Sequence, residues 1–173
     1  MSEINKKDLH TAIILGLGSK DNKVVLNSIN QLRQEGKPED VNHLFDLLLS
    51  TPTSEIKVSI LNFLADLKIQ ETDKIIIEAI KNDKYLSIRK SIVEVCWEAS
   101  IDFSKHLSVF VDLLIEADFE IAFEAFTVIE NITEKVPEMI KPVEMTKLKN
   151  AIPGSSAEKK GMIHEAIHII DQL

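Results

Sequence analysis

The sequence predicts an all-α protein built from about five helix pairs in series, and three observations support this. Apolar residues recur with helical spacing along the whole chain. Five apolar segments superpose at offsets of about 35, 32, 33 and 37 residues, a period typical of helical repeats. The composition agrees, because 45% apolar residues with only five glycines and five prolines suit helices better than a turn-rich β-sandwich.

The five superposable segments are expected to be the second helices of the pairs, at residues 24–32, 59–67, 91–99, 124–132 and 161–169. In each, apolar residues three and four positions apart form one stripe, which is expected to face the core. The first stripe is Val25, Leu26, Ile29 and Leu32, and the third is Ile92, Val93, Cys96 and Ala99.

The segments between them also have helical spacing and are expected to be the first helices of the pairs. They are Leu9–Leu15, Val41–Leu49, Thr72–Ile80, Leu107–Ile115 and Met139–Leu148. Each first helix can then pack on the second helix that follows it.

Helix-breaking and capping residues mark the boundaries. Gly36 and Pro38 separate the first pair from the second. Pro142 falls inside the last expected first helix and should interrupt it, because proline lacks the amide hydrogen that a helix interior needs. Ser155, with Glu158 three residues later, is expected to cap the final helix.

The stretch DKYLSIRKSI carries a polar signature at Asp83, Ile88 and Arg89. It resembles HEAT repeats and the related HEAT-like and armadillo-type solenoids. That family places an Asp at the end of the first helix and an Arg six residues later, beside a Val or Ile. The other pairs lack it, with Thr51 and Lys57, Gly16 and Asn22, and Glu116 and Ala122 at the matching positions. The resemblance implies a single α–α superhelix over residues 1–173, whose second helices line a concave side.

The charge pattern bears on the partner. The net charge is −8, and nine acidic residues between Glu98 and Glu134 share that stretch with one base, Lys105. Nucleic-acid binding relies on many Lys and Arg contacts to phosphates, so no nucleic-acid partner is expected. The acidic stretch is either an ordinary solvated surface or a face that attracts a basic protein partner.

Rows of equivalent positions on the second helices supply the candidate binding residues. Most of these positions are polar, but Trp97 and Phe123 are not. Trp97 is either an exposed anchor for a partner or a side chain packed into a groove between repeats. The candidates are Trp97, Phe123, Glu94, Thr127, Glu130 and Asn62.

The last helix contains the zinc-protease pattern H-E-x-x-H at His164, Glu165 and His168. A catalytic zinc needs a third protein ligand, and the five residues that follow offer too little chain to supply one. The pattern is therefore interpreted as the polar face of a terminal helix. No catalytic residue, metal or cofactor is expected, and Cys96 is expected to be a buried core residue.

The predicted function is a non-catalytic interaction or scaffold module that binds a protein partner on its concave or acidic face. The alternatives are a HEAT-like enzyme, such as a metal-dependent hydrolase acting through His164, Glu165 and His168, or a nucleic-acid-acting protein of the DNA glycosylase sort. A cytoplasmic location is expected, because the N-terminus does not resemble a signal peptide, no apolar run suits a membrane and there is one cysteine.

Overall fold

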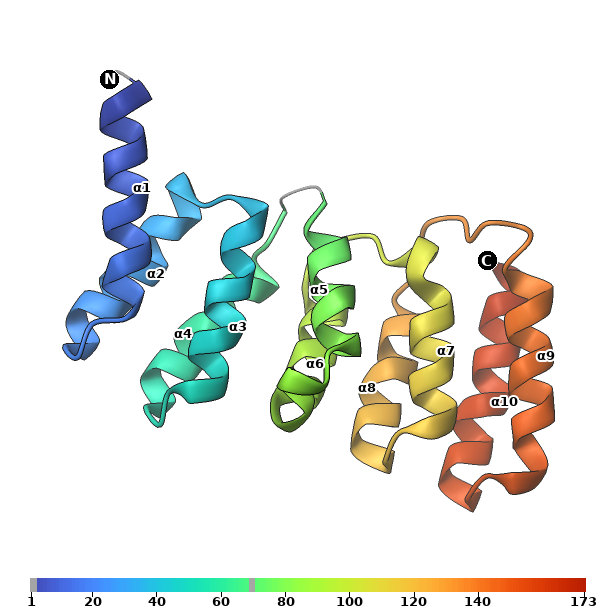
Figure 1. Ribbon diagram of the computed structural model, residues 1–173. Coiled ribbons are helices and arrows are strands. Elements are labelled where there is room, and N and C mark those ends of the chain that lie inside the picture. The colour runs from blue at the N-terminus through green and yellow to red at the C-terminus, as the bar shows by residue number, and fades with distance from the viewer. Residues whose placement is uncertain (1–2, 69–70) are drawn as a thin grey trace. The chain divides into compact units, whose positions relative to one another are not determined.

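The computed structural model describes residues 3–68 and 71–173, and within them every regular element is helical (Figure 1). The all-α prediction is therefore confirmed. No helix in this part of the chain is long and apolar enough to cross a membrane. The described α-helices are α1 (Glu3–Leu17), α2 (Asn22–Glu35), α3 (Val41–Ser50), α4 (Ser54–Ala65), α5 (Thr72–Lys81), α6 (Arg89–Glu98), α7 (Leu107–Glu116), α8 (Phe119–Glu130), α9 (Lys141–Ala151) and α10 (Ala157–Gln172).

Short 3₁₀ helices join several of these elements: η1 (Pro38–Asp40), η2 (Asp83–Ile88), η3 (Ser104–His106) and η4 (Ile152–Gly154). The five expected first helices correspond to α1, α3, α5, α7 and α9, and the five expected second helices correspond to α2, α4, α6, α8 and α10. The predicted boundaries differ most at α1, which begins six residues earlier than expected, at Glu3, while α9 begins two residues later than expected, at Lys141.

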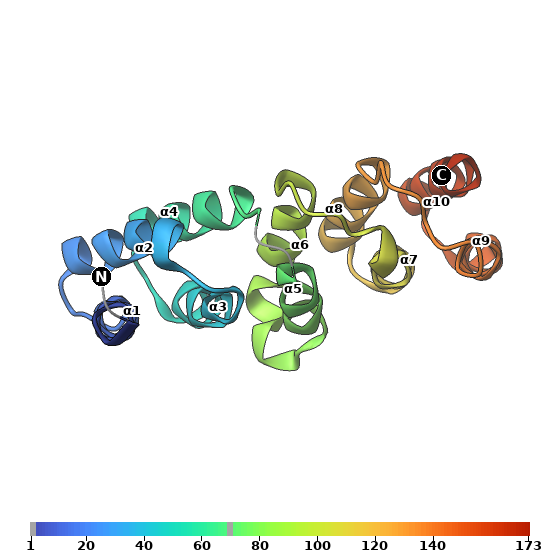
Figure 2. The same ribbon diagram turned by 90° about the horizontal axis from the view of Figure 1, so that it is seen from above.

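The chain divides into two compact units, Met1–Ile88 and Arg89–Leu173, called unit 1 and unit 2 below. In unit 1, α1, α3 and α5 form one layer, and α2 and α4 form the other (Figure 2). In unit 2, α7 and α9 form one layer, and α6, α8 and α10 form the other. Within each unit the predicted stripes of the second helices lie between the layers, where Ile29, Leu64 and Ile129 are fully buried.

Gly16 allows α1 and α2 to approach closely in unit 1. A β-carbon at this position would lie 2.1 Å from the Ser28 hydroxyl and 3.3 Å from the Ser28 β-carbon. Glycines near a helix C-terminus often adopt a left-handed conformation, but Gly16 and Gly18 do not, because no described glycine has a positive φ. Gly16 lies inside α1 and is needed for space rather than for a turn.

Two further local predictions were wrong. Pro142 does not interrupt α9 but stands in its first turn, where the missing amide hydrogen has no helical partner to lose. The cap of α10 is Ser156, one residue after the expected Ser155, and its hydroxyl accepts from the Lys159 amide. Ser155 instead donates to the Ala151 carbonyl and so belongs to the preceding helix end.

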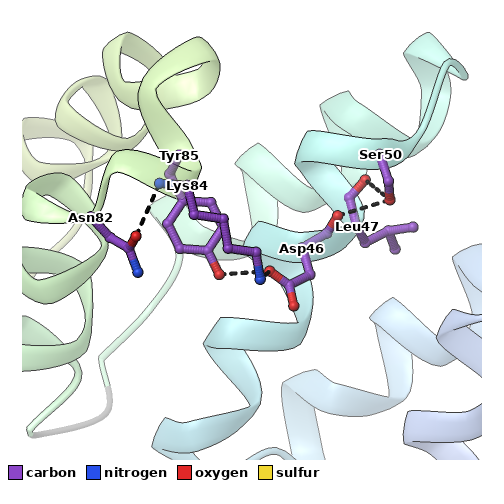
Figure 3. Close-up of polar contacts among 6 residues, drawn as sticks. All are labelled: Asp46, Leu47, Ser50, Asn82, Lys84 and Tyr85. Carbon is purple, nitrogen blue, oxygen red and sulfur yellow. Dashed lines mark hydrogen bonds and ion pairs between the residues drawn. The ribbon is translucent and has the colours of Figure 1, made fainter.

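A polar cluster fixes η2 to α3 in unit 1 (Figure 3). One carboxylate oxygen of Asp46 accepts the Tyr85 hydroxyl at 2.6 Å and the Lys84 ammonium group. Burial alone would raise the pKa of Asp46, but the hydrogen bonds from Lys84 and Tyr85 outweigh it and hold the pKa below its ordinary 3.8. Tyr85 is buried against Phe45, so the hydroxyl bond orients an aromatic ring of the core.

Two glycine substitutions should have opposite effects on stability. Gly16→Ala should lower the free energy of unfolding by about 1 kcal/mol, because the added methyl group meets Ser28. Gly161→Ala in α10 should raise it by about 0.5–1 kcal/mol, because alanine favours a helix and nothing lies within 4 Å of the new β-carbon. Chemical denaturation measures both, and Ser28→Ala should partly rescue Gly16→Ala. Equal stabilisation by both alanines would contradict the close approach of α1 and α2.

Tyr85→Phe should lower the free energy of unfolding by about 1 kcal/mol, because it removes the hydroxyl bond to Asp46.

Because the folded-state pKa of Asp46 is depressed, the contribution of Asp46 to the free energy of unfolding is present above about pH 4 and is lost as pH falls through the folded-state value. Asp46→Asn should therefore remove part of the acid-induced loss of stability, measured as unfolding midpoints between about pH 2 and 6. Glu78→Gln, at an exposed acid of α5, is the control. An identical pH profile for Asp46→Asn and wild type would refute this role.

Candidate binding surface

The six candidate residues are divided between the two units. Asn62 is exposed on α4 of unit 1. The other five lie in unit 2, with Glu94 and Trp97 on α6 and Phe123, Thr127 and Glu130 on α8. Each of these five side chains is exposed or partly exposed, and α6 packs directly on α8.

These five side chains and two neighbours form one surface of unit 2. We call it the α6–α8 face and define it as Glu94, Trp97, Phe119, Phe123, Glu124, Thr127 and Glu130. Its α8 members are mostly spaced three or four residues apart, so they lie along one side of that helix. The opposite side of α8 is buried through Ala122, Ala125 and Ile129.

Trp97 connects the two helices of this face. Its indole Nε1 donates to the Glu124 carboxylate at 2.9 Å, and its ring is partly buried. The side chain thus combines features of both sequence interpretations, since it packs at a helix boundary and still reaches the surface. The bond to Glu124 holds the ring in one orientation without removing it from solvent.

Two phenylalanines add apolar surface at the other end of α8. Phe119 and Phe123 are one helical turn apart, with ring centroids separated by 6.4 Å. Phe119 is 50% exposed and Phe123 is 49% exposed. Large aromatic side chains in water are typical of residues that anchor a protein partner.

The carboxylates of the face are close enough to influence one another. Partial burial raises the pKa of Glu94, and the nearby carboxylates of Glu124 and Glu98 raise it further. An ion pair between α6 and α8 joins Lys90 to Glu120 at 3.0 Å, and this bond raises the pKa of Lys90. A cation placed beside Glu94 and Glu124 would relieve the repulsion between them.

A cavity of about 300 Å³ opens beside Trp97, where α6 and α8 end. It is lined by segments that follow each helix, which include Asp102 and Phe103 on one side and Thr133 and Glu134 on the other. Both Asp102 oxygens accept hydrogen bonds from Ser104, one from its amide and one from its hydroxyl. The carboxylates and the two helix C-termini together make the cavity favourable for positive charge.

The H-E-x-x-H residues do not form a metal centre with a third ligand. His164, Glu165 and His168 are all exposed on α10. Across the described ranges, no group of three or more His, Cys, Asp or Glu side chains is arranged to hold a metal ion. Cys96 is buried as predicted; its thiol donates to the Ile92 carbonyl, and burial raises its pKa, which disfavours the reactive thiolate.

Two members of the α6–α8 face, Phe119 and Glu124, were not predicted from the sequence, and neither was the cavity. Phe119 could have been found, because it lies four residues before Phe123 and so shares its side of a helix. Glu124 could not, because its role depends on how α8 faces Trp97 of another helix. The cavity residues Asp102 and Glu134 lie in connecting segments, where no periodic pattern indicates which side chains meet.

Comparison with known proteins adds no assignment. No protein-family model matches the chain, and no curated protein has a significantly similar sequence. The geometry and charge of this surface are therefore the basis for assigning a function.

Replacing Glu124 by Gln should lower the pKa of Glu94, because it removes one nearby negative charge. The pKa should not return fully to its ordinary value, since burial is the largest cause of the increase and remains. A carbon-detected NMR titration of the Glu94 carboxyl measures the change, and Glu116→Gln on α7 is the control. An unchanged Glu94 titration in Glu124→Gln would show that the two carboxylates do not interact.

Proposed function

We propose that this protein is a non-catalytic interaction module, which binds a basic segment of a protein partner on the α6–α8 face. The observation that carries the proposal is the combination of exposed aromatic rings and interacting carboxylates on one side of two packed helices. Phe119, Phe123 and Trp97 offer apolar contact area, and Glu94, Glu124 and Glu130 offer negative charge. This combination suits a partner segment that has both basic and apolar side chains.

We also propose that the helix pairs form a HEAT-like solenoid. Support comes from the common register of the second helices and from the layering of first and second helices within each unit. The match of Asp83, Ile88 and Arg89 to the family signature adds to this. In such a solenoid each second helix exposes one side to solvent on the concave side of the superhelix, which agrees with a binding role for α6 and α8.

The alternative functions receive less support. An enzyme acting through His164, Glu165 and His168 would need a third metal ligand, and the described chain offers no such group around them. A nucleic-acid-binding role would need a basic surface, whereas α8 contains three glutamates and no lysine or arginine. A cytoplasmic location remains a prediction from the sequence.

Affinity capture tests the proposed function with two matched variants. One variant carries Phe123→Ala, Glu124→Gln and Glu130→Gln on α8. The control carries Val58→Ala and Glu55→Gln on α4, where Val58 is 56% exposed and has the same register position as Phe123. Wild type and control should capture the same basic partner, and the α8 variant should bind it at least about tenfold more weakly.

The binding should also weaken as salt concentration rises, because exposed charges are screened. Circular dichroism of each variant shows whether the helices remain folded. Capture of the same proteins in equal yield by the α8 variant and the control would exclude the α6–α8 face as the binding surface.

A further inference from the structure

The chain contains a second groove that corresponds to the cavity beside Trp97. In unit 1, a groove of about 240 Å³ lies where α2 and α4 end. It is lined by Leu32, Arg33, Phe63, Asp66, Leu67 and Lys68. The two hollows therefore occupy the same place in their units, at the C-terminal ends of two neighbouring second helices.

Each residue that lines the unit 1 groove has a counterpart in the lining of the unit 2 cavity. The alignment pairs Val25 of α2 with Ile92 of α6, and Ile60 of α4 with Ala125 of α8. On this register the six residues of the unit 1 groove fall on Ala99, Ser100, Val128, Asn131, Ile132 and Thr133, in the same order. All six line the cavity in unit 2.

The unit 1 groove holds a guanidinium group from the chain itself. Arg33 Nη1 lies 2.6 Å from the Asp66 carboxylate. Its guanidinium carbon also lies 5.5 Å from the centre of the Phe63 ring, within range of a cation–π contact. A planar cation thus fits between the two helix ends when an acid and an aromatic ring accompany it.

The unit 2 cavity also has acids and an aromatic ring, but they come from other positions, because Asn131 replaces Asp66 and Val128 replaces Phe63. Ser100 replaces Arg33, and Val128 replaces the larger Phe63, which leaves space. None of the residues that line this cavity in the described chain is a lysine or an arginine. The Trp97 ring and the carboxylates of Asp102 and Glu134 line it instead, so negative charge and a π face remain without a positive partner.

We propose that this cavity binds an arginine side chain from the partner's basic segment. The inference deepens the proposed function, since it names the group that enters beside Trp97. An ionised carboxylate has capacity for more than one hydrogen bond per oxygen, so Asp102 can accept from a guanidinium while it binds Ser104. Arginine is favoured over lysine, because its planar fork pairs with carboxylates and stacks on aromatic rings.

An NMR titration with a short capped peptide, acetyl-Gly-Ser-Arg-Ser-Gly-amide, tests this directly. Trp97 is the single tryptophan of the chain, so its indole N–H signal reports on the cavity without labelling elsewhere. The arginine peptide should cause a saturable shift of that signal. The matched citrulline peptide, which has the same shape and no charge, should bind at least about tenfold more weakly, and the lysine peptide should fall between them.

Unit 1 suggests a variant that supplies the unit 2 cavity with a guanidinium group of its own. Ser100→Arg with Asn131→Asp recreates in unit 2 the pair that Arg33 and Asp66 form in unit 1. Both positions are exposed, so the fold should tolerate the change. This double variant should abolish the shift by the arginine peptide, and Asn150→Arg on α9 is the control for an arginine added outside the cavity. Glu134→Gln leaves the space unchanged and should weaken binding.

The outcomes separate this inference from the proposed function. Two results together support an arginine site in the cavity. Wild type should prefer the arginine peptide over the citrulline peptide, and the double variant should lose binding of the arginine peptide. Equal binding of arginine and citrulline peptides, or no shift of the Trp97 indole, overturns it. If the double variant no longer distinguishes the peptides and also captures the partner more weakly than wild type, both proposals stand. If the arginine peptide does not bind at the cavity but the α8 variant still loses the partner, this inference is wrong and only the proposed function is supported.

Discussion

Burial of one stripe on each second helix is the constraint on which the rest of the structure depends. In unit 2, α8 packs against α6, α7 and α10, and its residues Ala122, Ala125 and Ile129 are completely buried. Three neighbours leave a single side of α8 in water. Phe119, Phe123, Thr127 and Glu130 occupy that side, so the core packing itself determines which side chains a partner can meet.

The hollows at the ends of the second helices differ between the two units. Each pair of ends creates a hollow, because two helices that stop together leave unpaired carbonyl groups and space. In unit 1 the hollow is lined by Arg33, which is paired with Asp66 and lies over the Phe63 ring. Unit 2 has smaller residues at the same register and gains the carboxylates of Asp102 and Glu134, which leaves an open and negatively charged cavity.

The arrangement of acids and aromatic rings explains why this region is a binding candidate rather than an ordinary solvated surface. An isolated surface glutamate keeps its hydration and contributes little to specificity. Glu94 is partly buried beside Glu124 and Glu98, so its charge is costly until a cation approaches. Glu124 meanwhile orients the Trp97 ring, which couples the charged and apolar parts of the surface.

The sequence by itself determined the helices, their pairing order and most of the buried stripe, because a 3.6-residue period and repeated spacing are local properties. It also indicated that Phe123 and the nearby acids face outward, and it left open whether Trp97 is exposed or packed in a groove. It misplaced Pro142 and the cap at Ser156, since boundaries depend on one or two residues. Only the tertiary structure decided that Glu124 binds Trp97 and that Ser100 and Asn131 line a cavity equivalent to the groove of Arg33 and Asp66. Those relations join different helices, and their distances follow from packing rather than from position along the chain.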